Sequence, residues 1–203
     1  MGSRAISQSA YKPLGMTSTF LDCYEDPLID VVHGYTGVGD AMTYLTELHE
    51  SVGWSAGGLV STASDLIAFA RGLFGGELFD DPVSLAAMTT DASGSFYGLG
   101  IALQEDYRGH AGGIAGFRSL LNYVPEFDTV VVILYNHDGA DPEPDRAEVL
   151  NPDLPLLRAE ECGLGRQSHL PRQIPNQIDG IRLMTVASHP LTLKWLIRRR
   201  LKS

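Results

Sequence analysis

The sequence is poor in cysteine and lacks a metal-binding motif. Cys23 and Cys162, the only cysteines among 203 residues, lie far apart and form neither a disulfide framework nor a metal-ligand pattern. None of the six histidines stands at zinc-site spacing from a cysteine or carboxylate, and no HExxH motif occurs. We therefore predict free thiols, no metal and no cofactor.

Long apolar runs are absent as well. No run reaches the roughly 18 apolar residues of a transmembrane helix. Residues 1–9 lack the apolar core of a secretory signal peptide, so by default we expect a cytoplasmic protein. The hydrophobic fraction of 44% is nevertheless sufficient for a core, and the length predicts one domain with room for a long tail.

Basic residues are scarce in most of the chain. Residues 1–163 hold 7 of the 15 Lys and Arg but 24 of the 25 Asp and Glu. Residues 164–203 hold the other 8 basic residues and only one acidic residue, Asp179. An acidic body of this kind argues against nucleic acid as a partner.

This change of charge divides the chain in two. We predict a folded body over residues 1–139 and a Pro-rich, then basic, tail over residues 140–203 that is not a domain. Within residues 140–203, we expect the end of the chain, residues 191–201, to be mobile. The alternative for residues 191–201 is a basic amphipathic helix in contact with a membrane surface.

Glycine, by contrast, is concentrated around one histidine. Residues 109–116 read Gly-His-Ala-Gly-Gly-Ile-Ala-Gly, so little side-chain bulk surrounds the imidazole of His110. Glycine is used where a backbone must approach a ligand closely, and histidine is the side chain most readily used near neutral pH. Apolar stretches before and after indicate a strand that lines a cleft. A Gly-rich hairpin with a solvated histidine is the alternative.

Two helices are predicted upstream of this stretch. Residues 61–65 resemble a capping box, apolar residues then recur at helical spacing as far as Phe74, and Gly75 and Gly76 end the helix. A second helix is expected over residues 82–88, with proline in its first turn.

From Tyr97 onward the pattern predicts strands. Short connections between successive strands require antiparallel pairing. Val130 to Leu134 is apolar at every position, so it is expected to be a central strand covered on both faces. The predicted fold class is α/β of the α+β type, with an antiparallel β-meander sheet packed with helices. The expected strands are residues 97–103, 108–112, 117–124 and 129–135.

One motif could supply a serine nucleophile at Ser55. Gly53-Trp54-Ser55-Ala56-Gly57 matches GxSxG, the nucleophile elbow, in which serine stands at a turn from a strand to a helix above a parallel sheet. Downstream histidines and aspartates are available as partners, namely His110, His137, Asp106 and Asp128. The segment before the motif is polar, however, and the predicted sheet is antiparallel.

A second motif, Ser9-Ala10-Tyr11-Lys12, matches SxxK. In SxxK hydrolases the serine begins a helix, and the lysine one turn later removes or shuttles its proton. Here Pro13 follows Lys12 at once, so no helix can continue behind the serine and bury the lysine.

Five motifs occur in order between about residues 10 and 137. In this order and at these spacings they resemble the C-terminal half of the serine β-lactamase-like family, which comprises class C β-lactamases, DD-peptidases and related esterases. The motifs are Pro13-Leu14-Gly15-Met16-Thr17-Ser18-Thr19, residues 57–66 with Phe69, Tyr97-Gly98-Leu99-Gly100, residues 110–113 with Gly116-Phe117-Arg118-Ser119, and residues 130–136.

The resemblance implies an acyl-serine mechanism. In the family, the serine of SxxK attacks the carbonyl of an amide, β-lactam or ester, and its lysine and the tyrosine of a YxN motif manage the protons. His110-Ala111-Gly112 matches the HxG motif, whose histidine faces the cleft and helps to orient the tyrosine or a substrate carboxylate. Gly113 corresponds to the residue that supplies an oxyanion-hole N–H. His110 and Gly113 are thus the catalytic candidates, and Ala111 and Gly112 the substrate-binding ones.

The chain departs from this family in its first two motifs. In the family, SxxK and YxN stand many tens of residues before the PLGM-like segment, whereas here twelve residues precede Pro13 and no Tyr-x-Asn occurs. We therefore expect an incomplete serine β-lactamase/transpeptidase-like fold that is inactive alone, from an enzyme of small-molecule or peptide substrates. Two alternatives stay open: a non-catalytic binding or assembly module that completes a separate N-terminal half, and an α/β-hydrolase-type esterase that uses Ser55.

Overall fold

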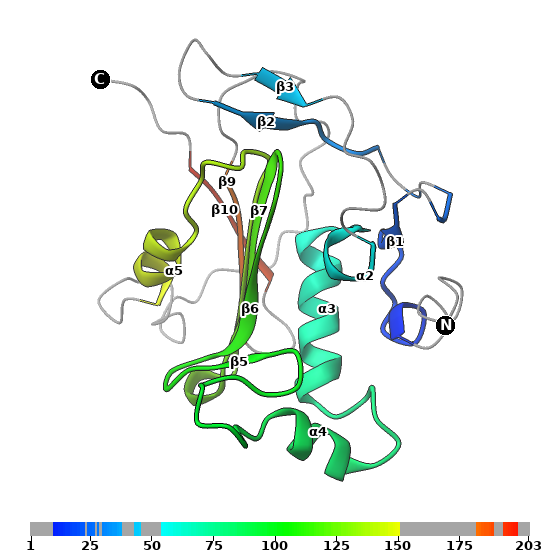
Figure 1. Ribbon diagram of the computed structural model, residues 1–203, viewed down its shortest axis with the longest axis vertical. Helices are drawn as coiled ribbons and strands as arrows, with labels where there is room; N and C mark the ends of the chain where they lie inside the picture. The colour runs from blue at the N-terminus through cyan, green and yellow to red at the C-terminus, as the bar shows by residue number, and fades with distance from the viewer. Residues whose placement is uncertain are drawn as a thin grey trace, which may run out of the picture.

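The computed structural model is organised around one six-stranded sheet with helices on both sides (Figure 1). Every pair of neighbouring strands in this sheet is antiparallel. The predicted fold class, an antiparallel meander packed with helices, is confirmed. The structure describes residues 10–22, 24–26, 28, 30–37, 43–45, 54–150, 182–188 and 193–198. Across the sheet the strands are β10 (Leu193–Arg198), β9 (Arg182–Ser188), β8 (Thr129–Tyr135), β7 (Phe117–Val124), β6 (Arg108–Ile114) and β5 (Ala102–Leu103).

The remaining elements are short, apart from one helix. Two small antiparallel pairs stand outside the main sheet: β1 (Phe20–Leu21) with β4 (Leu59–Val60), and β2 (Gly34–Thr36) with β3 (Thr43–Leu45). The helices are α2 (Trp54–Gly57), α3 (Ala63–Phe74), α4 (Pro82–Met88), α5 (Glu143–Val149) and the 3-10 turn η4 (Pro125–Phe127).

Strand β8 is the centre of the core. Its first five residues are all buried, and they alternate between the two faces of the sheet. On one face Val130 and Val132 pack against α3, and on the other Val131 and Ile133 pack with Val149 of α5. The two helices accordingly lie on opposite sides of the sheet in Figure 1. The prediction of a covered, central strand is confirmed.

Helix α3 begins where the capping pattern predicts. The side chain of Thr62 accepts a hydrogen bond from the backbone N–H of Asp65, and the helix ends at Gly75. The buried Asp65 carboxylate in turn accepts hydrogen bonds from the Ser18 N–H and the Thr19 hydroxyl, both at 2.8 Å. The PLGM segment is therefore fixed to the first turn of α3. It also packs along the helix, since a Cβ at Gly72 would overlap the Leu14 side chain.

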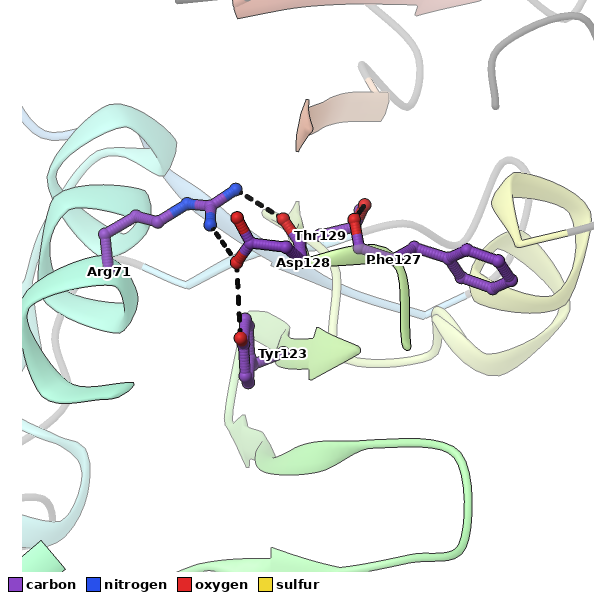
Figure 2. A network of polar contacts seen from close by, with 5 residues as sticks. All are labelled: Arg71, Tyr123, Phe127, Asp128 and Thr129. Atoms are coloured by element: carbon purple, nitrogen blue, oxygen red, sulfur yellow. Dashed lines mark hydrogen bonds and ion pairs between the residues drawn. The ribbon is translucent and has the colours of Figure 1, made fainter. Parts of the chain in front are cut away.

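The turn between β7 and β8 is tied to α3 by a polar network (Figure 2). The Arg71 guanidinium donates to the carboxylate of Asp128 and, at 2.6 Å, to its backbone carbonyl. The Tyr123 hydroxyl donates to the same carboxylate at 3.2 Å. Asp128 has φ +44°, a left-handed conformation that aspartate tolerates better than most residues. The network thus fixes this turn against the C-terminal part of α3.

The C-terminal part differs from the expectation. The sequence predicts a tail after residue 139, yet α5 packs on the sheet and β9 pairs with β8 along six residues. Within residues 191–201, where a mobile tail or an amphipathic helix is expected, Leu193–Arg198 form a strand, β10, and the other residues lie outside the described ones. The physical reason is tertiary, because β8 is buried on both faces and needs a partner at its second edge. Local periodicity carries no signal for such pairing.

None of the described helices combines the length and the apolar composition that a membrane-spanning segment needs.

Candidate functional site

All four predicted site residues lie on β6 and all four are exposed. Strand β5 pairs with β6 only at Arg108 and Gly109, so within the described residues β6 forms an open edge from His110 onward. Alternate residues of an antiparallel strand turn their N–H and C=O groups away from the paired neighbour. The open edge therefore presents backbone donors and acceptors of alternate residues of the stretch from His110 to Gly113, beside the imidazole.

Two hydrogen bonds hold the His110 ring. Its Nε2 lies 2.7 Å from the hydroxyl of Tyr97, and its Nδ1 lies 2.5 Å from the carbonyl oxygen of Ala111. The two rings also meet edge to face, with centroids 5.8 Å apart and an angle of 83°. The imidazole is thus exposed but fixed in one orientation.

The segment that carries Tyr97 is not the regular strand that its sequence predicts. Phe96 and Gly100 both have positive φ, and only an isolated bridge, Tyr97 to Ala102, joins the segment's two ends. A Cβ at Gly98 would overlap the backbone carbonyl of Met88 at the end of α4. The expected strand over residues 97–103 shortens to β5 for this reason.

Upstream of Tyr97, Asp91 organises the loop. Its carboxylate accepts hydrogen bonds from four backbone N–H groups, at 2.7 to 3.2 Å. Burial raises the pKa of Asp91, but the four hydrogen bonds together outweigh it and hold the pKa below its usual range. The donors are Ser93, Gly94, Ser95 and Phe96.

Arg118 on β7 lies across the second glycine of the site. Gly113 and Arg118 are directly paired, and a Cβ at Gly113 would overlap the guanidinium. A Cβ at Gly112 would likewise lie 2.6 Å from the hydroxyl oxygen of Ser119, its own partner on β7. Side chains of β7 thus lie close over both glycines, and the absence of a Cβ leaves the edge open.

The turn between β6 and β7 is anchored by Asp138. Gly116, third in this turn, has φ +82°, as a type II turn requires. Its N–H donates to the Asp138 carboxylate at 3.2 Å. This hydrogen bond is the main cause that lowers the pKa of Asp138, and a hydrogen bond from Thr36 and the charges of His137 and Arg118 lower it further. The carboxylate thus stays ionised at neutral pH beside the end of β6.

Comparison with known proteins identifies the family. The model of the family described as "Beta-lactamase" matches residues 3–154. The chain belongs to the Beta-lactamase family. The matched range contains β6 and Tyr97 together with helices α2 to α5. The predicted relationship to serine β-lactamase-like and penicillin-binding-protein-like hydrolases is confirmed.

The similar proteins and structures are distant in sequence and longer. A Bacillus subtilis (strain 168) protein named penicillin-binding protein PbpX is 29% identical over 133 residues, which are 64% of this chain and 33% of that protein. A D-stereospecific amidohydrolase from Streptomyces sp. has a TM-score of 0.58 at 24% identity, over 72% of this chain and 47% of its own. A penicillin binding protein from Bacillus halodurans has a TM-score of 0.62 at 18% identity, over 72% and 48%. The chain thus spans a third to a half of the length of these relatives.

The described residues do not give either serine motif the structural surroundings that its chemistry needs. Ser55 lies in α2, which leads into β4, and the sheets around it are antiparallel rather than parallel. Ser9 lies outside the described residues, while Lys12 is exposed in a turn. A nucleophile elbow needs a strand before its serine and a parallel sheet below it. The structure therefore gives Ser55 no support as a nucleophile of the α/β-hydrolase type.

Two residues were missed by the sequence-based choice of site residues. Tyr97 and Arg118 belong to the motifs that carry the family resemblance, but neither was assigned a role. Their contacts with His110 and Gly113 depend on a loop that crosses the edge of β6 and on cross-strand pairing. Among the described residues, no group of three or more His, Cys, Asp or Glu side chains could hold a metal ion.

Proposed function

We propose that this chain forms the His-x-Gly side of an acyl-serine hydrolase site. The observation that carries the proposal is the open edge of β6, where a fixed imidazole stands three residues from an exposed Gly113. In this proposal the Gly113 N–H donates to the oxyanion that forms on the substrate carbonyl. His110 faces the substrate, and Ala111 and Gly112 bind its backbone.

The physical basis is electrostatic preorganisation. A backbone N–H on a paired strand cannot turn away when charge develops, so it stabilises the tetrahedral intermediate without reorganisation. Strand β6 is held by β7 along its whole length, which fixes the donor. Loss of one such donor costs about 100- to 1000-fold in rate in other hydrolases.

The nucleophile is proposed to come from another segment. The 203 residues contain no Tyr-x-Asn and only the SxxK at Ser9, whose lysine is exposed in a turn. We expect this chain alone to hydrolyse nothing, and to become active with a segment that carries SxxK and YxN. The names of its relatives, an amidohydrolase and penicillin-binding proteins, support an amide or β-lactam as the substrate class, and an ester is the alternative.

The first experiment treats the purified chain with a fluorophosphonate probe and with a chromogenic β-lactam. We expect neither labelling nor hydrolysis. Labelling that disappears in Ser55→Ala would instead assign the activity to Ser55 and overturn the proposal.

The second experiment adds a separately produced N-terminal segment of a Beta-lactamase family member that contains both motifs. Hydrolysis should appear only in the mixture, and Gly113→Pro, which removes the N–H, should lower kcat by about 100- to 1000-fold. Proline is tolerated at an open strand edge. Glu105→Gln, an exposed change in the loop before β6, serves as the control and should leave the rate unchanged. Equal rates for Gly113→Pro and the control would remove Gly113 from the mechanism.

A further inference from the structure

The hydrogen bonds of His110 define its tautomer. The carbonyl oxygen of Ala111 can only accept, so the proton must be on Nδ1. In the neutral ring Nε2 then carries a lone pair, which accepts a hydrogen bond from the Tyr97 hydroxyl. A tyrosine hydroxyl can donate or accept, so this partner satisfies Nε2 in either charge state. Both ring nitrogens are therefore engaged by the protein itself.

We propose that Tyr97 is the positioning residue of His110: its hydroxyl holds the imidazole against the Ala111 carbonyl at the open edge of β6, and this carbonyl in turn fixes the Nδ1–H tautomer. The inference rests on the proposed function in so far as His110 faces a substrate. In a histidine, the hydrogen bond at one ring nitrogen determines which of the two nitrogens carries the proton. The partner of the ring therefore determines whether a given nitrogen donates or accepts.

Hydrogen bonds hold the backbone of the loop on both sides of Tyr97. Phe96 has φ +59°, an unfavourable conformation for an aromatic residue, and its own N–H is bound by the Asp91 carboxylate at 2.7 Å. On the other side of Tyr97, the Gly98 N–H donates to the Ile101 carbonyl at 2.8 Å, and the Leu103 N–H donates to the Phe96 carbonyl at 2.8 Å. Both neighbours of Tyr97 are thus held by hydrogen bonds.

The apolar side chains of this loop do not explain its conformation. Phe96 and Leu99 are 64% and 69% exposed, so the strained backbone is not stabilised by burying them. Between Phe96 and Leu99, the Tyr97 side chain contacts His110 through both its hydroxyl and the edge of its ring. The strained backbone is held instead by the hydrogen bonds to Asp91, and strain retained in this way clusters at functional sites.

The test is a measurement of the His110 tautomer by long-range ¹H–¹⁵N correlation on the full, uniformly labelled chain at pH 8. The His110 signals are assigned by their loss in His110→Gln. We expect a pyrrole-type signal for Nδ1 and a pyridine-type signal for Nε2 in the wild-type chain. Tyr97→Phe should release the ring from the Ala111 carbonyl and so shift His110 toward the Nε2–H tautomer that a free imidazole prefers in water, with the thermal melting temperature unchanged.

Tyr107→Phe is the matched control, because Tyr107 lies in the loop just before β6 and contacts Arg146 rather than His110. It should leave the His110 signals as they are. A pyrrole-type Nε2 in the wild-type chain, or unchanged His110 signals in Tyr97→Phe, would overturn the proposal. If Tyr97→Phe does not fold, Asp91→Ala, which frees the loop without touching either ring, is measured instead with the same two criteria.

A rate measurement separates this inference from the proposed function. In the reconstituted mixture Tyr97→Phe should lower kcat by about tenfold with KM unchanged. In metalloenzymes, losses of this size follow when the partner that orients a metal-binding histidine is removed. The tautomer needs no nucleophile and is measured on the chain alone. A Tyr97-dependent tautomer in an assembly that never hydrolyses would refute the proposed function and leave this inference standing.

Discussion

Strands β6 and β8 have the same length and lie on either side of β7, yet they are opposite in character. Strand β8, Thr-Val-Val-Val-Ile-Leu-Tyr, has its first five residues buried between α3 and α5. Strand β6, Arg-Gly-His-Ala-Gly-Gly-Ile, has four consecutive exposed residues and an open edge. Strand β8 holds the sheet together through its side chains, whereas β6 contributes mainly its backbone and one imidazole.

This difference teaches where the sheet can tolerate a site. A strand whose side chains form the core cannot also offer free space and free backbone groups to a ligand. Strand β6 can offer both, because its pairing with β7 holds it in register from Arg108 to Ile114. Its own side chains therefore need not pack in the core. The candidate site is therefore supported by the neighbouring strand β7 rather than by packing of its own side chains.

The largest expected effect is a charge placed in β8. Val132→Asp would bury an unpaired carboxylate between the sheet and α3 and should lower the free energy of unfolding by about 4 kcal/mol or more. Ala111→Asp, the matched change on exposed β6, should alter it by less than about 0.5 kcal/mol. Urea denaturation followed by circular dichroism measures both. Similar losses for the two variants would abolish the contrast between the strands.

A second, smaller effect separates two glycines within β6. A Cβ at Gly109 would overlap the backbone carbonyl of Leu121, so Gly109→Ala should cost about 1–3 kcal/mol. A Cβ at Gly113 would meet only the end of the Arg118 side chain, which can move, so Gly113→Ala should stay within about 0.5 kcal/mol. Both changes restrict the unfolded chain equally. The difference between their urea midpoints therefore reports the contact, and the reverse order would contradict the structure.

The turn that joins β7 to β8 is expected to matter less. Asp128→Asn keeps a residue that tolerates positive φ but removes the charge that faces Arg71. Because the Asp128 side chain is 56% exposed, we expect a loss of about 0.2–1 kcal/mol. The loss should shrink in about 1 M NaCl, where such pairs are screened. A loss that is independent of salt would show that the charge is not the cause.

The smallest effect is local and depends on pH. The pKa of Asp91 is lowered in the folded chain, so its contribution to the loop is present above the pKa of the unfolded chain and is lost as pH falls through the folded value. The amide signals of Gly94 and Phe96 should titrate with a midpoint below about 3.9, the ordinary aspartate value. Asp91→Asn should abolish this titration. A midpoint at or above the ordinary value would mean that the carboxylate does not hold the loop.

Much of the fold could be predicted because its signals are local. The cap of α3 at Thr62, the proline at the start of α4 and the short turns between β6, β7 and β8 all lie within a few residues of the elements that they define. The apolar run of β8 also announces burial on both faces. These elements lie where the sequence predicts them, within two residues.

What could not be predicted depends on contacts between distant segments. Strands β9 and β10 exist because the second edge of β8 needs a partner, and the short form of β5 follows from Gly98 against the end of α4. The contact between Gly113 and the Arg118 guanidinium also depends on the pairing of β6 with β7. The His-x-Gly residues were found through their resemblance to a family, whereas the partner of the histidine, Tyr97, needed the structure.

The pairing of β8 with β9 has a consequence for how the protein is made. During synthesis β6, β7 and β8 leave the ribosome in order and can pair as they appear, since each is next to its neighbour in the chain. The second edge of β8 waits for Arg182–Ser188, and at about 5–20 residues per second that delay lasts several seconds. For that time the apolar strand β8 has one bare edge, which can pair with another nascent chain. The order of the strands thus makes the interval before β9 emerges the moment when a chaperone would be most useful.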